Sequence, residues 1–273
     1  MRFTVSDFLK KFPDDNACID HLFQRKYTDS CCPKCEKKTK FYRVKRRKSF
    51  ECGTCGYQVY PMSGTIMEGS TTPARLWYYA IYLFSQSKNG VSAKELERQL
   101  GVTYKTAFRM GHRIRESMAR QSVELVGVVH IDESLYGPRG KNNKRGWAAE
   151  KKVCLFGMIE KGGNVKVVVV KDRKNETLIP IIEKYVSKDS EALHTDKFGV
   201  YKKLPGRGFK HKIKDNTTVS TNCIEGYWGN FKKSIAGTHT WVTEGYLQNY
   251  LTEFEFRHNN RKGDIFDEII KSI

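Results

Sequence analysis

The stretch VELVGVVHID, residues 123–132, is an apolar run of strand length with charged residues at its ends. An uninterrupted apolar strand is typical of the buried centre of a sheet, because neighbouring elements cover both of its faces. VCLFGMIEKGGNVKVVVVKD, residues 153–172, follows and predicts a β-hairpin that turns at Gly162 and Gly163. The chain therefore builds a sheet after residue 123, with a central strand followed by a hairpin.

Shorter elements complete this part of the chain. Residues 176–187 read as a helix, EALHTD (191–196) and FKHKIKDN (209–216) as strands, and residues 221–235 as a helix that leads into a helical tail. The order strand, hairpin, helix, strand, strand, helix predicts an α/β fold in which helices flank a central mixed sheet. The expected domain spans residues 124–273, tail included.

Three smaller segments are expected before this domain. The first reads as two short helices separated at Pro13 and Asp14, the second is rich in cysteine and strand-like, and the third reads as three helices. Thr72 and Pro73 are expected to start the first helix of the third segment. The expected bounds of the three segments are 1–30, 31–62 and 72–120.

The charge balance indicates a polyanionic partner. The chain has 49 Lys and Arg against 30 Asp and Glu, a formal net charge of +19, which favours nucleic acid or an anionic membrane surface. No apolar run approaches the roughly 20 residues that cross a bilayer, and MRFTVSDFLKKF lacks the features of a secretory signal. We therefore expect a cytoplasmic protein without a membrane partner, whose eight cysteines are thiols or metal ligands rather than disulfides.

Four of these cysteines have the spacing of a metal site. Cys32 and Cys35 form one C-x2-C pair, and Cys52 and Cys55 form a second. This spacing predicts structural Zn2+, because four converging thiolates leave no coordination position open for chemistry. The module is too small for a sufficient core, so metal binding worth roughly 10–16 kcal/mol would supply its folding free energy. The remaining cysteines are expected to be free thiols: Cys18, Cys31, Cys154 and Cys223.

Two basic segments are candidates for DNA contact. Arg46 and Arg47 lie in a cationic run between the cysteine pairs, which either touches DNA, the interpretation we favour, or forms a solvated hairpin. SAKELERQLGVTYKTAFRMGHRIRE, residues 92–116, has the pattern of a helix-turn-helix. The alternative to a DNA-binding helix-turn-helix is an ordinary trihelical bundle whose basic face is solvated. Its expected DNA-binding residues are Tyr104 and Lys105 towards the major groove, and Arg109 and Arg113 towards phosphates.

Three carboxylates lie at the boundaries of the sheet elements. Asp132 is expected to end the first buried strand and Asp196 to end EALHTD, whereas Glu225 lies in the first turn of the helix 221–235. Glu225 shares a helix face with Trp228 and Lys232. Hard divalent cations such as Mg2+ or Mn2+ prefer oxygen ligands, and paired ions held by carboxylates promote displacement at phosphorus. The sequence therefore predicts a metal nuclease that grips nucleic acid with its cations.

Each of these assignments has a structural alternative. His130 and His194 precede their aspartates by two positions and point to the same side of the strand, so they either support the carboxylates or are strand histidines with satisfied ring nitrogens. Glu225 also fits a capping box with the backbone of Asn222, which would make it structural.

The order strand-Asp, strand-Asp, helix-Glu resembles an RNase H-like fold, and nearly the whole chain resembles a known family. That family is the ISXO2-like DDE insertion-sequence transposases with an N-terminal zinc ribbon, which are related to the eukaryotic Merlin elements. The resemblance implies that Asp132, Asp196 and Glu225 are the catalytic acids and that Lys232 contacts DNA. The motifs that carry it are CPKC, CGTC, YPMSGTIMEGSTTP, HIDES, HTDKFGVY, TNCIEGYWGNFKKSIAGTHTWV and YLTEFEFRHNNR.

The resemblance implies Mg2+-dependent cleavage and strand transfer at the terminal inverted repeats of the element and into target DNA. It also implies at least a dimer during synapsis and a bacterial, nucleoid-associated location. The chain departs from the family in GTHTWV, where His239 and Trp241 stand in a segment that carries a tyrosine in other members. Two rival hypotheses are a zinc-ribbon and helix-turn-helix regulator without catalysis, and an RNase H-like nuclease that cannot join ends.

Overall fold

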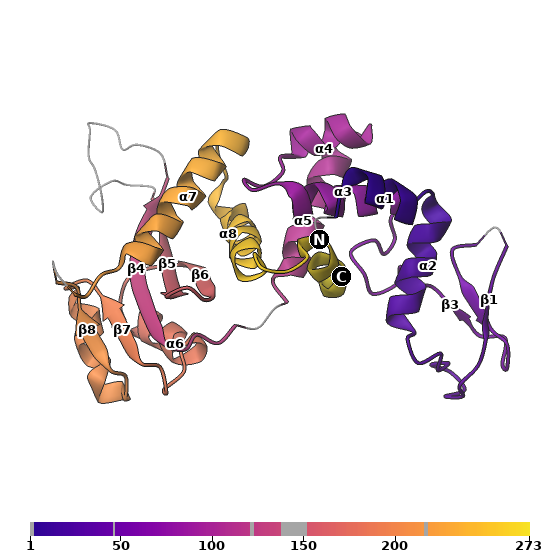
Figure 1. Cartoon of the computed structure of the whole chain (residues 1–273). Coiled ribbons are helices and arrows are strands. Elements are labelled where there is room, and N and C mark those ends of the chain that lie inside the picture. The colour runs from indigo at the N-terminus through magenta and orange to yellow at the C-terminus, as the bar shows by residue number, and fades with distance from the viewer. Residues whose placement is uncertain (1–2, 46, 121–122, 138–151, 216–217) are drawn as a thin grey trace. The chain divides into compact units, whose positions relative to one another are not determined.

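The structure is a computed structural model that describes residues 3–45, 47–120, 123–137, 152–215 and 218–273. The chain forms two compact units, each with its own elements (Figure 1). One unit comprises Met1–Ser87, Ala93–Ser117 and Phe266–Ile273, and the other comprises Lys88–Ser92 and Met118–Ile265.

The second unit is built on a five-stranded mixed sheet. Its strand order is β6-β5-β4-β7-β8, in which β4, β5 and β6 pair antiparallel while β7 and β8 run parallel to β4. The α/β arrangement predicted from the sequence, a central mixed sheet flanked by helices, is confirmed, including the central strand and the hairpin at Gly162. The strands are β4 (Val128–Tyr136), β5 (Val153–Glu160), β6 (Val165–Val170), β7 (Ala192–Thr195) and β8 (His211–Ile213).

Helices cover the two faces of this sheet. One face packs on α6 (Asn175–Tyr185) and on the short 3-10 helices η3 (Gly199–Lys203) and η4 (Pro205–Arg207). The other face packs on α7 (Asn222–Thr238) and α8 (Glu244–Asn259). Because strand side chains alternate, Ile131 enters the core beneath α6, and His130 and Asp132 belong to the face that α7 covers.

Helix α7 packs directly onto the backbone of β5 at Gly157. A Cβ atom at this position would lie 2.5 Å from Cζ2 of Trp228 and 2.8 Å from Cδ1 of Ile224. Only glycine allows this approach, since these distances are shorter than van der Waals contact. Gly157 is also the register partner of Asp132 on β4, so the close approach sets α7 against the strand pair that carries the first acid.

Helix α8 completes the hydrogen bonding of the free edge of β6. Gln248, Glu255 and Asn259 lie on one face of α8 and accept hydrogen bonds from strand amides. The amide groups of Gln248 and Asn259 also donate back to strand carbonyls at 3.3 and 3.0 Å. The helix therefore closes an edge that would otherwise expose unpaired backbone groups. The accepted bonds are Val169 N to Gln248 Oε1 at 2.8 Å, Val167 N to Glu255 Oε2 at 3.0 Å, and Val165 N to Asn259 Oδ1 at 2.8 Å.

The first unit combines helices with a small antiparallel sheet of order β1-β2-β3. The helix break predicted at Pro13 and Asp14 is confirmed, since Asp14 caps α2 by accepting from the amide of Ala17 at 2.8 Å. Helix α3 begins one residue later than expected, with Pro73 as its N-cap. The elements are α1 (Val5–Lys11), α2 (Asp15–Lys26), β1 (Phe41–Arg43), β2 (Phe50–Cys52), β3 (Gln58–Val59), α3 (Ala74–Gln86), α4 (Ala93–Leu100), α5 (Tyr104–Met118) and α9 (Ile265–Ser272).

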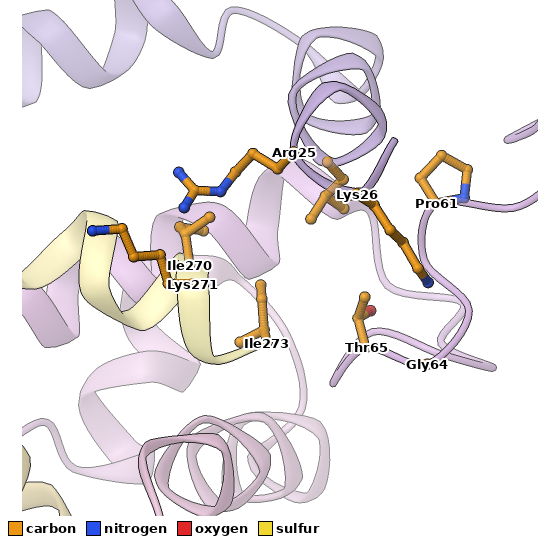
Figure 2. A pocket seen from close by; sticks show the side chains of 9 residues that line it. Arg25, Lys26, Pro61, Gly64, Thr65, Ile270, Lys271 and Ile273 are labelled. Atoms are coloured by element: carbon orange, nitrogen blue, oxygen red, sulfur yellow. The ribbon is translucent and has the colours of Figure 1, made fainter. Parts of the chain in front are cut away.

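The end of the helical tail folds with the first unit. Phe266 on α9 packs against Phe12 and Tyr78, with ring centroids 5.8 and 6.3 Å apart, and Asp267 pairs with Arg25 at 2.6 Å. A cavity of about 280 Å³ remains between α2, the segment 61–65 and α9, and Figure 2 shows the side chains that line it. Its cations are already engaged, since Arg25 and Lys271 pair with Asp267 and Lys26 donates to the carbonyl of Ser63.

Candidate active site

Strand register brings Asp132 and Asp196 together. The parallel pairing of β4 with β7 ends where His130 lies opposite His194, and each aspartate follows its histidine by two residues. Asp132 lies in the middle of β4, which continues to Tyr136, so the prediction that Asp132 ends its strand was wrong. Antiparallel pairing with β5 carries β4 onward, whereas β7 stops at Thr195 and leaves Asp196 at its carboxyl end.

Glu133 joins the two aspartates, which sequence reasoning did not predict. A carboxylate oxygen of each of Asp132, Glu133 and Asp196 lies within 4.8 Å of the other two. Glu133 is buried, and its Oε1 accepts a hydrogen bond from the hydroxyl of Tyr201 at 2.6 Å. The sequence signal for Glu133 was its position directly after Asp132 in HIDES. Neighbouring residues of a strand point to opposite faces, however, so the sequence argued against a site shared by both carboxylates.

Glu225 lies near this cluster and is held by other partners. Its Oε1 accepts from Lys214 Nζ at 2.6 Å and from Thr221 Oγ1 at 2.5 Å. The hydrogen bond from Lys214 is the main reason that the pKa of Glu225 is lowered. Helix α7 begins at Asn222 with Thr221 as its N-cap and no side-chain cap bond. The capping box with Asn222 is therefore not formed, and the partners of the carboxylate are Lys214 and Thr221 rather than the backbone of Asn222.

The acidic cluster has the donor chemistry of a divalent metal site. Burial, followed by the charge of Glu133, raises the pKa of Asp132 to about 7, and the charges of Asp196 and Glu225 contribute to this rise. Burial likewise raises the pKa of Glu133. Close carboxylates that lose water need either protons or a cation, and all-oxygen ligands suit hard divalent ions. Asp132, Glu133 and Asp196 therefore fit a divalent metal, with Glu225 beside them.

The rings of His130 and His194 stack on each other, and their Nδ1 atoms do not hydrogen-bond to the aspartates. The rings of His130 and His194 have centroids 5.3 Å apart and an interplanar angle of 15°. Their Nδ1 atoms are buried and have no hydrogen-bond partner in the described chain. Burial lowers the pKa of His130 to about 4. His194 also has a hydrogen bond with the backbone of Ser220, as the alternative of a strand histidine with a satisfied ring nitrogen expects.

The rest of α7 and the segment after it contain three further residues that were singled out from the sequence. Lys232 is exposed on α7, but partial desolvation of its ammonium group, followed by the charge of Lys152, lowers its pKa, and the charge of Asp132 opposes this shift. Trp241 is 46% exposed and stacks on Tyr136, with ring centroids 5.1 Å apart. His239 packs edge-on against Tyr250.

The four cysteines of the ribbon converge as the zinc prediction requires. Sγ of Cys32 lies 3.7 Å from that of Cys55, Sγ of Cys35 lies 3.9 Å from that of Cys52, and all four atoms lie within 4.8 Å of one another. Tetrahedral zinc with Zn–S bonds of about 2.3 Å separates its sulfur ligands by about 3.8 Å. Glu36 and Gly56 follow the two pairs at matching positions with φ of 55° and 69°, so both knuckles turn alike.

Some of the basic residues expected to touch DNA have other partners. Arg47 is exposed, and Arg46 lies outside the described residues. Arg43 pairs with Asp20, and Lys48 pairs with Asp15 at 3.3 Å, so these two cations fasten the ribbon to α2.

The helices α4 and α5 are joined by a tight turn at Gly101, whose φ is 64°. Tyr104, Lys105 and Arg109 are exposed on α5. Arg113 instead donates through NH1 to the carbonyls of Ile66 and Glu68, at 2.9 and 3.1 Å. Its guanidinium therefore fixes the segment that precedes α3.

The described helices include none that is long and apolar enough to cross a membrane.

A mixed sheet that carries a cluster of acidic side chains, preceded by a four-cysteine ribbon, matches the two domains of an insertion-sequence transposase. Residues 124–259 match the ISXO2-like transposase domain, and residues 13–58 match the transposase zinc-ribbon domain. The chain belongs to the insertion-sequence transposase family in which these two domains occur together.

Known proteins share parts of this organisation. An uncharacterized protein in transposable element ISH50 of Halobacterium salinarum is 25% identical over 278 residues, which cover 91% of this chain and 92% of the relative. The catalytic core domain of HTLV-2 integrase, solved in complex with magnesium, is 14% identical with a TM-score of 0.33, over 51% of this chain and 90% of that one. The catalytic core domain of BIV integrase is 10% identical with a TM-score of 0.32, over 53% of this chain and 94% of that one.

Proposed function

We propose that this transposase binds the terminal inverted repeats of an insertion sequence, hydrolyses a phosphodiester bond there, and transfers the strand to target DNA. One observation carries the proposal. The register of β4 and β7 sets Asp132 beside Asp196, and the contact of α7 with Gly157 sets Glu225 next to them. Three acids from two strands and one helix thus gather in a protein with a formal charge of +19.

Each residue has a defined task in this proposal. Asp132, Asp196 and Glu225 hold Mg2+ or Mn2+, and Glu133, fixed by Tyr201, adds negative charge beneath them. Divalent ions held by these residues would supply activation of the attacking oxygen and stabilisation of the leaving oxygen. Lys232, on the same helix as Glu225, binds a DNA phosphate. The attacking group is water during hydrolysis and a 3′-hydroxyl during strand transfer.

The first unit supplies the DNA contacts in this proposal. Tyr104, Lys105 and Arg109 are exposed on α5, and Arg47 is exposed on the ribbon that Zn2+ stabilises. Arg46 shares the role proposed for Arg47. Arg113 supports this surface through its bonds to Ile66 and Glu68 rather than through a phosphate. Two ends must meet before strand transfer, so we propose at least a dimer, acting on the nucleoid of a bacterial cytoplasm.

The first prediction tests the acids separately from DNA binding. Asp132→Asn and Asp196→Asn each remove one metal-binding oxygen charge, so cleavage and strand transfer should fall by about a hundredfold or more. The measurement uses labelled duplexes from both flanks of the coding sequence, with Mg2+ or Mn2+, and an electrophoretic mobility shift assay reports binding. Binding should remain within about twofold, since phosphate contacts come from lysines and arginines.

Three results would contradict the proposal. Strand transfer retained by either variant would remove the acids from catalysis. Binding by the wild type without metal-dependent cutting would favour the DNA-binding regulator. Cleavage without any joined product would favour a nuclease that cannot join ends.

A further inference from the structure

Lys214 connects two parts of the acidic site. It directly follows β8, and its ammonium group lies 2.6 Å from Oε1 of Glu225. The hydrogen bond to Glu225 raises the pKa of Lys214, and the charges of Asp132 and Asp196 add to this effect. Lys214 also lines an open cavity of about 670 Å³ together with Asp196, Lys197, Ile213 and Asp215. One cation therefore contacts a catalytic acid and borders open space beside another.

The bonds at Glu225 explain why this acid stands apart from the other three. Its Oε1 accepts from both Lys214 and Thr221, whereas the close cluster of carboxylates contains Asp132, Glu133 and Asp196. An oxygen that already accepts two hydrogen bonds has no lone pair free for a metal ion. Glu225 must therefore give up at least the ammonium of Lys214 before this oxygen can ligate a cation.

We propose that Lys214 is a positioning residue that neutralises Glu225 in the metal-free site and passes to a DNA phosphate when Glu225 binds a divalent cation. This inference rests on the proposed function. The exchange needs no covalent step, because the ammonium keeps its proton and replaces one oxyanion with another. The open cavity gives the freed side chain a place beside Asp196 where the DNA backbone can lie. Lys214 thus couples metal occupancy to phosphate binding.

One variant, Lys214→Met, should strengthen Mn2+ binding and weaken DNA binding. Lys214→Met removes the competitor for Glu225 and one repelling positive charge, so Mn2+ should bind roughly three- to tenfold more tightly. The same variant lacks a phosphate contact, so at saturating Mn2+ it should cleave and bind an end duplex several-fold less well. The slope of log affinity against log salt should fall by about one. A surface ion pair without this role would leave DNA affinity, cleavage and the salt slope unchanged.

The first measurement is a titration of the zinc-loaded full-length protein with Mn2+ in the absence of DNA, followed by electron paramagnetic resonance of free Mn2+. Lys214→Arg keeps the positive charge and should bind Mn2+ no more tightly than the wild type. Lys203→Met removes the same charge from an exposed side chain on η3 in the same unit and should leave Mn2+ affinity unchanged. Glu225→Gln should bind Mn2+ more weakly than the wild type.

The results separate this inference from the proposed function. If Asp132→Asn loses Mn2+ and Lys214→Met binds it as the wild type does or more weakly, the role of Lys214 is overturned while the metal site stands. If Asp132→Asn and the wild type bind Mn2+ equally, the acidic site itself is overturned. Tighter Mn2+ binding together with weaker DNA binding in Lys214→Met, and neither change in Lys203→Met, supports the exchange.

Discussion

A single glycine determines how close the third acid comes to the first two. Gly157 lies opposite Asp132 on β5 and lets Trp228 and Ile224 of α7 rest on the strand backbone. Glu225 lies one helical turn before Trp228, so the distance between α7 and the sheet also sets the position of Glu225. Residue size at one strand position is thus linked to the geometry of the metal site.

The second prediction follows from this contact. Gly157→Ala would place Cβ 2.5 Å from Trp228, so α7 must shift outward, and the free energy of unfolding should fall by about 1–3 kcal/mol. Mn2+ affinity should also fall, because Glu225 moves with the helix. Urea denaturation and the Mn2+ titration measure the two effects.

A second glycine on α7 provides the matched control. Gly229 has open space where its Cβ would be, so Gly229→Ala should stabilise the helix by about 0.5–1 kcal/mol. Equal stability of Gly157→Ala and the wild type would show that α7 does not depend on this close approach.

At the scale of elements, α8 replaces a sixth strand with side chains. Gln248, Glu255 and Asn259 occupy positions along one helix face and meet alternate amides of β6. Glu255 is buried and also pairs with Lys166 at 2.8 Å, so its charge is compensated. This explains why YLTEFEFRHNNR is so polar for a helix against a sheet. Its polar residues satisfy backbone groups, and its apolar residues enter the core.

The third prediction removes one of these bonds. Asn259→Leu leaves the amide and carbonyl of Val165 unpaired, so the free energy of unfolding should fall by about 1–3 kcal/mol and aggregation through the exposed edge should rise. Asn259→Asp keeps the acceptor and loses only the donor, so it should cost less. Denaturation and light scattering report both effects, and equal behaviour of the two variants would refute the role of this edge.

The fourth prediction concerns the ribbon. Cys52→Ser removes one of four thiolates, so bound zinc should fall from about one equivalent to a small fraction and the ribbon should unfold. Cys31 adjoins the site but lies outside the four-sulfur cluster, so Cys31→Ser should retain its zinc. Zinc content by elemental analysis and ribbon order by limited proteolysis test this contrast. Loss of zinc in both variants would indicate a different ligand set.

At the scale of the whole molecule, the two units should respond differently to acid. Burial lowers the pKa of His21 and His112 in the first unit to about 4. In the unfolded chain these histidines take up protons near pH 6.5, whereas in the folded protein they stay neutral until about pH 4. The free energy of unfolding is therefore unaffected by them above pH 6.5 and falls as the pH drops from 6.5 towards 4. In the second unit burial also lowers the pKa of the histidines His130, His194, His211 and His258. There the raised pKa of Asp132, Glu133 and Glu255 acts in the opposite direction as pH falls and offsets this loss of stability.

The fifth prediction is that acidification destabilises the first unit before the second. Between pH 7 and 4.5, hydrogen exchange measured by mass spectrometry should accelerate in α3 and α5 while β4 and β5 stay protected without metal. His112 is buried on α5, so His112→Gln should restore roughly 1–3 kcal/mol of the lost stability at pH 4.5. Loss of protection in both units at the same pH, or no effect of His112→Gln, would contradict this assignment.

The amino-acid sequence alone determined much of this protein. Alternation and apolar runs predicted the sheet and the hairpin at Gly162, and the spacing of Cys32, Cys35, Cys52 and Cys55 predicted the metal ribbon. It also associated Asp132 and Asp196 with two separate strands, whereas the pairing of β4 with β7 appeared only in the structure. These features were readable because each depends on contacts within a few residues or on a period that a short segment carries.

Only the tertiary structure decided which distant groups meet. Tyr201 reaches Glu133 across 68 positions, and Asn259 reaches Val165 across 94. Lys214 reaches Glu225 across a loop and a change of element, and the last helix packs with the first unit rather than with the sheet. No local pattern specifies such partners, because their pairing depends on strand register and helix packing over the whole chain. The sequence thus determined the acids and the metal-binding cysteines, whereas the fold decided which charges surround them.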